Sequence, residues 1–192
     1  MEQPSDAVLS PKTLCHVVIR TVPEHFTAMV HFWTTALGGS ITWKNDFLCF
    51  ITYDYEHHRI AIISRQGTTP HPPGEVYMRS GLAHIAFGYE SLRGLFTAYQ
   101  QRKKAGINPV WSVNHGPTTS IYYEDIDGNE LETQVDNFDT PEEANAFMNS
   151  PQWVENPVGA DIDPDAMLKR LDNGESEASL KVRASVGPRN RR

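Results

Sequence analysis

The chain has 192 residues, of which 39% are hydrophobic and 21% charged, proportions typical of a globular protein rather than a disordered one. A formal net charge of −7 argues against general nucleic-acid binding. No apolar run approaches the roughly 20 residues that a membrane span needs, and the first residues lack a signal-peptide pattern. We therefore expect a cytoplasmic protein without membrane or nucleic-acid partners, in which Cys15 and Cys49, both in apolar runs, are buried free thiols.

After an N-terminal tail (1–11), the first part of the chain predicts one helix among four strands. Residues 12–20 are rich in Val and Ile, as in a half-buried strand. Apolar residues at helical spacing follow, up to the glycine pair 38–39. Three strand-like pieces come next: SITWK (40–44), FLCFITY (47–53) and RIAIIS (59–64). Residues 12–66 thus form one predicted βαβββ module.

The same order returns after a connector rich in Pro and Gly, residues 67–81. GLAHIAFGY (81–89) predicts a strand, and apolar residues at helical spacing predict a helix that ends near Gly106. Three more strands are expected at NPVWSV (108–113), TSIYYED (119–125) and ELETQV (130–135). Residues 82–137 therefore predict a second βαβββ module, and the fold class is α+β. Residues 138–192 form a C-terminal extension with short helices near 141 and 164 and a disordered end.

The duplication suggests where a site lies. His16 in LCHVVIRT and His84 in LAHIAFGY occupy the same slot of the two modules, and Glu132 aligns with Ala61. A pseudo-twofold axis would bring residues in the same slot to one cleft, and strand alternation leaves Glu132 on the cleft side. Two His and one carboxylate with open positions are the ligands of non-haem Fe(II) oxygenases. The alternative is that each histidine is an ordinary hydrogen-bonded strand residue.

The stretch NHGPTTSIYYEDIDGNELE (114–132) resembles the signature of type I extradiol ring-cleavage dioxygenases, except that Ile126 stands where a proline is usual. Over residues 12–137 the chain resembles the vicinal oxygen chelate superfamily, which also includes glyoxalase I and bleomycin-resistance proteins. The resemblance implies two βαβββ modules in a mixed, cleft-enclosing β-sheet. It also implies a metal held by His16, His84 and Glu132, with Fe(II) expected and Mn(II) possible.

The resemblance further implies catalytic residues around the metal. His115 falls where the dioxygenases keep a histidine that hydrogen-bonds O₂ or substrate, and Tyr122 falls on their substrate-orienting tyrosine. HHRIAI (57–62) resembles the segment with their acid–base histidine, which indicates His58. Strand alternation instead puts His57 on the face of Ala61, unless a bulge re-aims His58. The motif favours His58, and both remain candidates.

The expected function is the opening of a catechol-like ring by a metal-dependent dioxygenase, with a diol and O₂ as substrates. A non-redox metal enzyme of the isomerase, lyase or glyoxalase type is the alternative, although Ala61 removes the second carboxylate of the glyoxalase branch. A metal-free small-molecule binding protein is a further alternative, from another functional class. Family habit implies a homodimer or a larger homo-oligomer.

Overall fold

The structure, a computed structural model, describes residues 8–69 and 80–189. The chain divides into two compact units, Met1–Pro70 and His71–Arg192. Most of the predicted tail (1–11) and connector (67–81), and the last three residues of the extension, lie outside the described residues. None of the described helices is long and apolar enough to span a bilayer.

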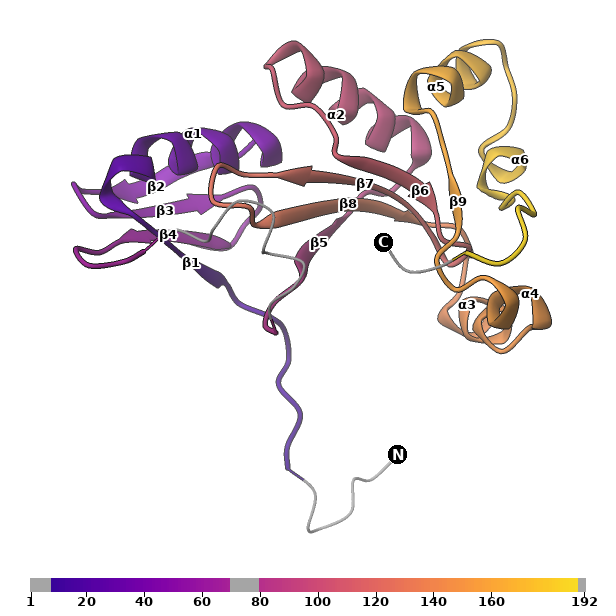
Figure 1. The fold of residues 1–192 in the computed structure, drawn as a ribbon, viewed down its shortest axis with the longest axis horizontal. Helices are drawn as coiled ribbons and strands as arrows, with labels where there is room; N and C mark the ends of the chain where they lie inside the picture. Colours follow the sequence, from indigo (N-terminus) through magenta and orange to yellow (C-terminus); the bar gives the residue numbers. More distant parts are fainter. Residues whose placement is uncertain (1–7, 70–79, 190–192) are drawn as a thin grey trace. The chain divides into compact units, whose positions relative to one another are not determined.

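The first unit is a four-stranded mixed sheet with a helix on one face (Figure 1). Its elements are β1 (Val17–Thr21), the 3-10 turn η1 (Pro23–His25), α1 (Phe26–Leu37), β2 (Ser40–Lys44), β3 (Leu48–Thr52) and β4 (Ile60–Ser64). The strand order is β1-β4-β3-β2, and β1 runs parallel to β4. The order of elements confirms the first predicted module.

The core of the first unit lies between α1 and the sheet. Met29 and Trp33 of α1 and Ile51 and Ile62 of the sheet are fully buried. Gly38 ends the helix with φ at 60°, a left-handed conformation that glycine adopts without steric cost.

The two cysteines of this unit differ in exposure. Cys49 in β3 is buried, as predicted, but the prediction for Cys15 is wrong, because this residue is exposed. The strand begins at Val17, so Cys15 precedes it and does not share the burial of the core.

The second unit repeats this plan and adds one strand. Its sheet and helix consist of β5 (His84–Gly88), α2 (Leu92–Lys104), β6 (Trp111–Asn114), β7 (Thr118–Glu124) and β8 (Glu130–Asp136). The strand order is β5-β8-β7-β6-β9, where β9 (Ala160–Asp161) comes from the C-terminal extension. Leu131, Thr133 and Val135 of β8 are buried, and so are Glu130 and Glu132 between them, while α2 contacts this strand.

The strand registers of the two units coincide. Val18 pairs with Ala61 across the parallel strands β1 and β4, and Ala86 pairs with Glu132 across β5 and β8. Val18 and Ala86 stand two residues after His16 and His84, so the sequence alignment of the two histidines holds in three dimensions. The α+β class and the duplicated βαβββ plan are confirmed, and each module forms its own sheet.

The extension contains four short helices and β9. The helices are α3 (Pro141–Met148), α4 (Pro151–Glu155), α5 (Pro164–Asp172) and α6 (Glu177–Lys181). The predicted helices near 141 and 164 are confirmed, and Thr140 and Glu143 form a reciprocal capping box at the first of them. The sequence did not predict α4, α6 or β9, because each has only two to five residues.

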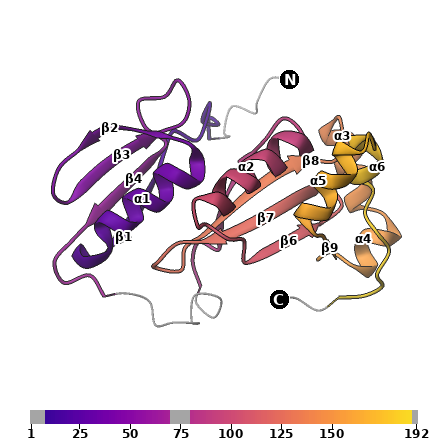
Figure 2. The same ribbon diagram turned by 90° about the horizontal axis from the view of Figure 1, so that it is seen from above.

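Helix α5 packs beside α2 in the second unit (Figure 2). Asp165 joins the two helices: it accepts hydrogen bonds from Tyr99 Oη at 3.0 Å and Gln100 Nε2 at 2.7 Å, and Lys103 Nζ lies 2.5 Å from its Oδ2. The hydrogen bond from Lys103 is the largest of the effects that lower the pKa of Asp165. This carboxylate therefore holds part of the extension on the repeated fold.

The Lys103–Asp165 pair predicts a pH-dependent coupling in stability. Both side chains are nearly half exposed, so the coupling measured in a double-mutant cycle with Asp165→Asn and Lys103→Met should be small. Because the folded pKa of Asp165 is lowered, the coupling should be complete at pH 7. The coupling should disappear as the pH falls below the ordinary pKa of an aspartate, about 3.9, and then through the lower pKa that Asp165 has in the folded protein. Denaturant unfolding at pH 7 and at acid pH measures it, and a coupling independent of pH would contradict this assignment.

Candidate functional site

A histidine and a carboxylate meet on one face of the second sheet. His84 begins β5 and Glu132 lies in the middle of β8, and the parallel pairing places their side chains on the same face. His84 Nε2 is 2.9 Å from Glu132 Oε2. Glu132 is only 4% exposed, and a buried carboxylate is costly unless it is paired or binds a metal. The contact with His84 therefore offsets part of the cost of burying the Glu132 carboxylate.

The pair stabilises opposite charges on its two members. The hydrogen bond to Glu132 raises the pKa of His84 against the effect of burial. Burial by itself would raise the pKa of Glu132, but hydrogen bonds with His84, Ser120 and Tyr122 outweigh it and lower that pKa. Glu132 thus stays ionised at neutral pH, and its charge favours the protonated form of His84. A buried carboxylate that is ionised can bind a cation without first losing a proton.

Tyr122 and His115 lie next to this pair. The ring of Tyr122 meets that of His84 edge-on with centroids 5.5 Å apart, and its hydroxyl is 3.0 Å from His115 Nε2. Trp111 stacks on Tyr122 at 5.1 Å. The second unit thus brings together four of the six residues singled out in the sequence: His84, His115, Tyr122 and Glu132.

Burial also sets the protonation of Tyr122 and His115. Burial, followed by the charge of Glu132, raises the pKa of Tyr122 above its ordinary value, so the hydroxyl keeps its proton at neutral pH. Burial lowers the pKa of His115, which favours the neutral imidazole. The tyrosine is therefore a hydrogen-bond donor, and the histidine has one nitrogen free of a proton.

The first unit groups the remaining two residues. The ring centroids of His16 and His58 are 4.5 Å apart, and His58 stacks on Phe50 at 4.4 Å with an interplanar angle of 18°. Arg59 holds the segment before β1, because its Nη1 donates to the carbonyls of Leu14 at 2.9 Å and Cys15 at 3.1 Å. This contact fixes the backbone that carries His16.

The contacts of His57 and His58 differ. Strand β4 starts only at Ile60, so its alternation does not extend back to either histidine. His58 stacks on Phe50, which pairs with Ala61, whereas the side chain of His57 is 74% exposed. Burial and the neighbouring histidines lower the pKa of His58. His58 is therefore the more enclosed of the two, with a neutral ring against His16.

Equivalent positions in the two units carry different chemistry. Phe50 pairs with Ala61 in the first sheet, and Tyr122 pairs with Glu132 in the second. The first unit thus has apolar side chains where the second has a hydroxyl and a carboxylate. Neither unit by itself, over the residues described, brings together three His, Cys, Asp or Glu side chains that could hold a metal ion.

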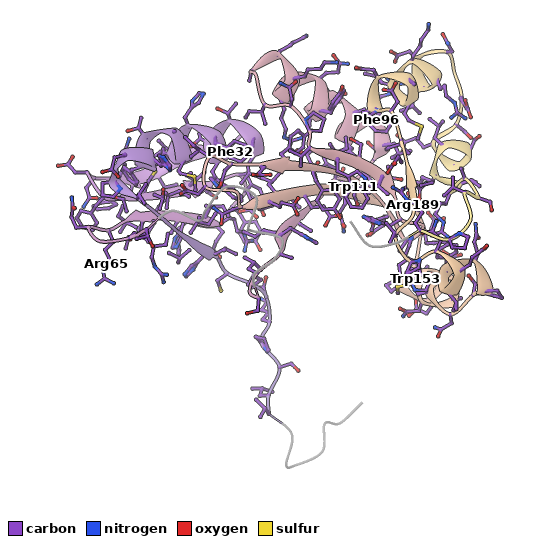
Figure 3. The ribbon with its side chains drawn as sticks, viewed as in Figure 1. Phe32, Arg65, Phe96, Trp111, Trp153 and Arg189 are labelled. Carbon is purple, nitrogen blue, oxygen red and sulfur yellow. The ribbon has the colours of Figure 1, made fainter. Side chains whose placement is uncertain are left out.

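The extension contributes contacts to this site that the sequence did not indicate. His115 Nδ1 lies 2.5 Å from the carbonyl of Val158, and Arg183 donates to the carbonyl of His115 at 2.9 Å. Trp111 and Arg189, both labelled in Figure 3, each bond to Asp161. Residues such as these have no local signature, because a backbone carbonyl contact depends on the path of the chain and not on residue type.

Comparison with known proteins gives one family. The model of the Glyoxalase/Bleomycin resistance protein/Dioxygenase superfamily matches residues 14–133. A protein of Rhodococcus globerulus named biphenyl-2,3-diol 1,2-dioxygenase 2 is 40% identical over 166 residues, which are 86% of this chain and 84% of that protein. Biphenyl-2,3-diol 1,2-dioxygenase 3 of the same organism is 37% identical over 89% of this chain and 88% of its own length.

Solved structures agree on the fold. A glyoxylase/bleomycin resistance protein/dioxygenase domain from Frankia superposes with a TM-score of 0.53 and 19% identity, over 66% of this chain and 93% of that one. At this identity the likeness concerns the fold alone. The family model that matches residues 14–133 and the relative that is 40% identical show that the chain belongs to the glyoxalase/bleomycin resistance protein/dioxygenase superfamily, the vicinal oxygen chelate proteins, and the duplicated βαβββ plan agrees with this.

Proposed function

We propose that this protein is a metal-dependent extradiol-type dioxygenase that opens a catechol-like ring with O₂. The observation that carries the proposal is the contact of His84 with the buried carboxylate of Glu132, with Tyr122 and His115 beside it. Its two curated relatives are named as dioxygenases of an aromatic vicinal diol, and each match spans more than four-fifths of both chains. The substrate class proposed is therefore aromatic vicinal diols.

The proposed metal ligands are His16, His84 and Glu132. The donor atoms of His84 and Glu132 are 2.9 Å apart, and two donors that share an ion lie about 3 Å apart when each is about 2.1 Å from it. The second unit offers this pair, and His16 holds the slot of the repeat equivalent to His84. Two imidazoles and a carboxylate suit Fe(II), the proposed cofactor, and also suit Mn(II). When bound, such an ion acidifies diol hydroxyls and supports chemistry with O₂.

The other residues have proposed roles that follow from their protonation. His58, neutral because burial lowers its pKa, would accept a proton from a diol hydroxyl and return it later, as a general acid–base group does. Tyr122, which keeps its proton, would orient a substrate oxygen. His115, also neutral, would present Nε2 to the same space. The aromatic rings of Trp111 and Phe50 would exclude water.

Ala61 favours oxygenase chemistry over a glyoxalase-type reaction. It occupies the position equivalent to Glu132, so the repeat supplies three protein ligands rather than four. Three ligands leave open positions for both a diol and O₂. A non-redox reaction at the same metal would need an open position for its substrate but none for O₂.

The proposal is tested with anaerobically purified protein supplied with Fe(II) and then with Mn(II). Oxygen uptake and a coloured ring-opened product are expected with biphenyl-2,3-diol or a simpler catechol. Metal binding without oxygen uptake from any diol would favour the non-redox alternative. Diol binding without metal would favour the binding protein. Light scattering in the same preparation tests the proposed homodimer or larger homo-oligomer.

Glu132→Gln tests the ligand set. The amide keeps the shape and can accept a hydrogen bond from His84, so the protein should fold. Metal affinity should fall by more than the roughly ten- to hundred-fold that loss of an outer partner costs. Glu130→Gln is the matched control, because Glu130 stands two residues earlier on the same face of β8 and is not a proposed ligand. Elemental analysis after dialysis measures both, and full metal occupancy in Glu132→Gln would rule out the assignment.

His58→Gln tests the acid–base role. We expect kcat to fall by roughly 10²- to 10⁴-fold while the metal is retained, because the residue moves a proton and holds no ion. His57→Gln is the control, since this exposed neighbour has the same residue type and should retain activity. Turnover lost in His57→Gln but kept in His58→Gln would transfer the role to His57.

A further inference from the structure

We propose that the C-terminal extension fixes the tautomer and position of His115, with the Val158 carbonyl and Arg183 as positioning groups. The significance for catalysis rests on the proposed function, but the contacts do not. The matched family model covers residues 14–133, so the extension lies outside the part of the chain that defines the family. All groups involved belong to the second unit.

The contact with Val158 decides which nitrogen of His115 carries the proton. A carbonyl oxygen only accepts hydrogen bonds, so at 2.5 Å from it Nδ1 must be the protonated nitrogen. In the neutral ring Nε2 is then the unprotonated nitrogen, and it faces Tyr122 Oη 3.0 Å away. The opposite tautomer would place two lone pairs, on Nδ1 and on the carbonyl oxygen, against each other.

The loop that carries this carbonyl is held by its own hydrogen bonds. Asn156 Oδ1 accepts from the backbone N–H of Val158 at 3.1 Å and of Gly159 at 2.8 Å. Asn156 Nδ2 donates to the carbonyl of Gly159 at 3.1 Å, and the side chain is buried. These bonds fix the peptide unit that contains the Val158 carbonyl and the units before and after it.

Arg183 ties this loop to the backbone of His115. Its Nη1 donates to the carbonyls of His115 at 2.9 Å and Asn156 at 2.7 Å, and its Nη2 donates to that of Gln152 at 2.8 Å. The residue is 7% exposed, so these bonds form away from solvent. One planar guanidinium can serve three carbonyls in this way, which a lysine cannot reproduce. Arg183 therefore sets the distance between the loop and the histidine.

Gly159 permits the loop to approach this closely. Its φ is +109°, and a Cβ added there would lie 2.3 Å from the Asn114 carbonyl oxygen and 2.8 Å from His115 Cα. Any side chain at this position would push the loop away from His115. Gly159→Ala, which adds only a methyl group, should therefore separate the loop from His115.

A parallel set of contacts reaches Tyr122 through Trp111. Strand β9 pairs with β6, and Asp161 of β9 accepts a hydrogen bond from Trp111 Nε1 at 2.9 Å. Trp111 in turn stacks on Tyr122. The extension therefore supports both partners of the His115–Tyr122 hydrogen bond.

The test is ¹⁵N NMR of the full-length chain with labelled histidine, treated with a chelator so that no paramagnetic ion broadens the signals. His115→Asn assigns the resonances. In the natural sequence His115 should show a protonated Nδ1 and an unprotonated Nε2. In Gly159→Ala a population with protonated Nε2 should appear. Gly174→Ala is the matched control, because Gly174 lies in the same extension at φ +90° but a Cβ there meets nothing within 4 Å.

Activity gives the second measurement. Gly159→Ala should lower kcat for a diol by about ten- to hundred-fold with little change in KM, whereas Gly174→Ala should not. Protonated Nε2 in the natural sequence, or an unchanged tautomer in folded Gly159→Ala, would overturn the inference. Should Gly159→Ala fail to fold, Arg183→Lys replaces it, with the same shift expected and the same unchanged tautomer as refutation. A shifted tautomer in a protein that cleaves no diol would refute only the proposed function.

Discussion

A buried carboxylate in a strand is the feature on which the rest of the site depends. Glu132 lies where burial would favour its neutral form, and its contacts with His84, Ser120 and Tyr122 reverse that preference. These partners lie on the two strands that pair with β8: His84 on β5, and Ser120 and Tyr122 on β7. The parallel pairing of β5 with β8 is therefore a functional constraint as well as a structural one, because a shift of one residue would turn Glu132 into the core.

The duplication explains both what the two units share and how they differ. Both place an aromatic residue on the third strand opposite the key position of the fourth, but Phe50 faces Ala61 in the first unit and Tyr122 faces Glu132 in the second. The first unit adds His58, stacked between Phe50 and His16, where the second adds His115 on a strand end. One backbone plan thus carries ion-pair chemistry in one copy and aromatic stacking in the other.

The extension gives the second unit a further structural layer. It adds β9 to the edge of the sheet, docks α5 on α2 through Asp165, and contacts the backbone of His115 through Arg183. These contacts stabilise residues of the site from outside the repeated fold. A site residue held by a backbone carbonyl and a buried guanidinium has less freedom than one at the surface, and this restriction favours a defined geometry for chemistry.

The sequence by itself determined the α+β class, the two modules, most strand positions and the equivalence of His16 with His84, because hydrophobic periodicity and repeat spacing are local properties. It also singled out Glu132, since alternation along a strand assigns each side chain to a face. It misplaced Cys15 and left His57 and His58 open, because strand ends and hairpins do not follow alternation. Only the tertiary structure revealed that Val158 and Arg183 contact His115 and that Gly159 permits the close approach of the loop. The two contacts join residues 43 and 68 positions apart in the chain, and in each the acceptor is a backbone carbonyl, for which residue type carries no signal.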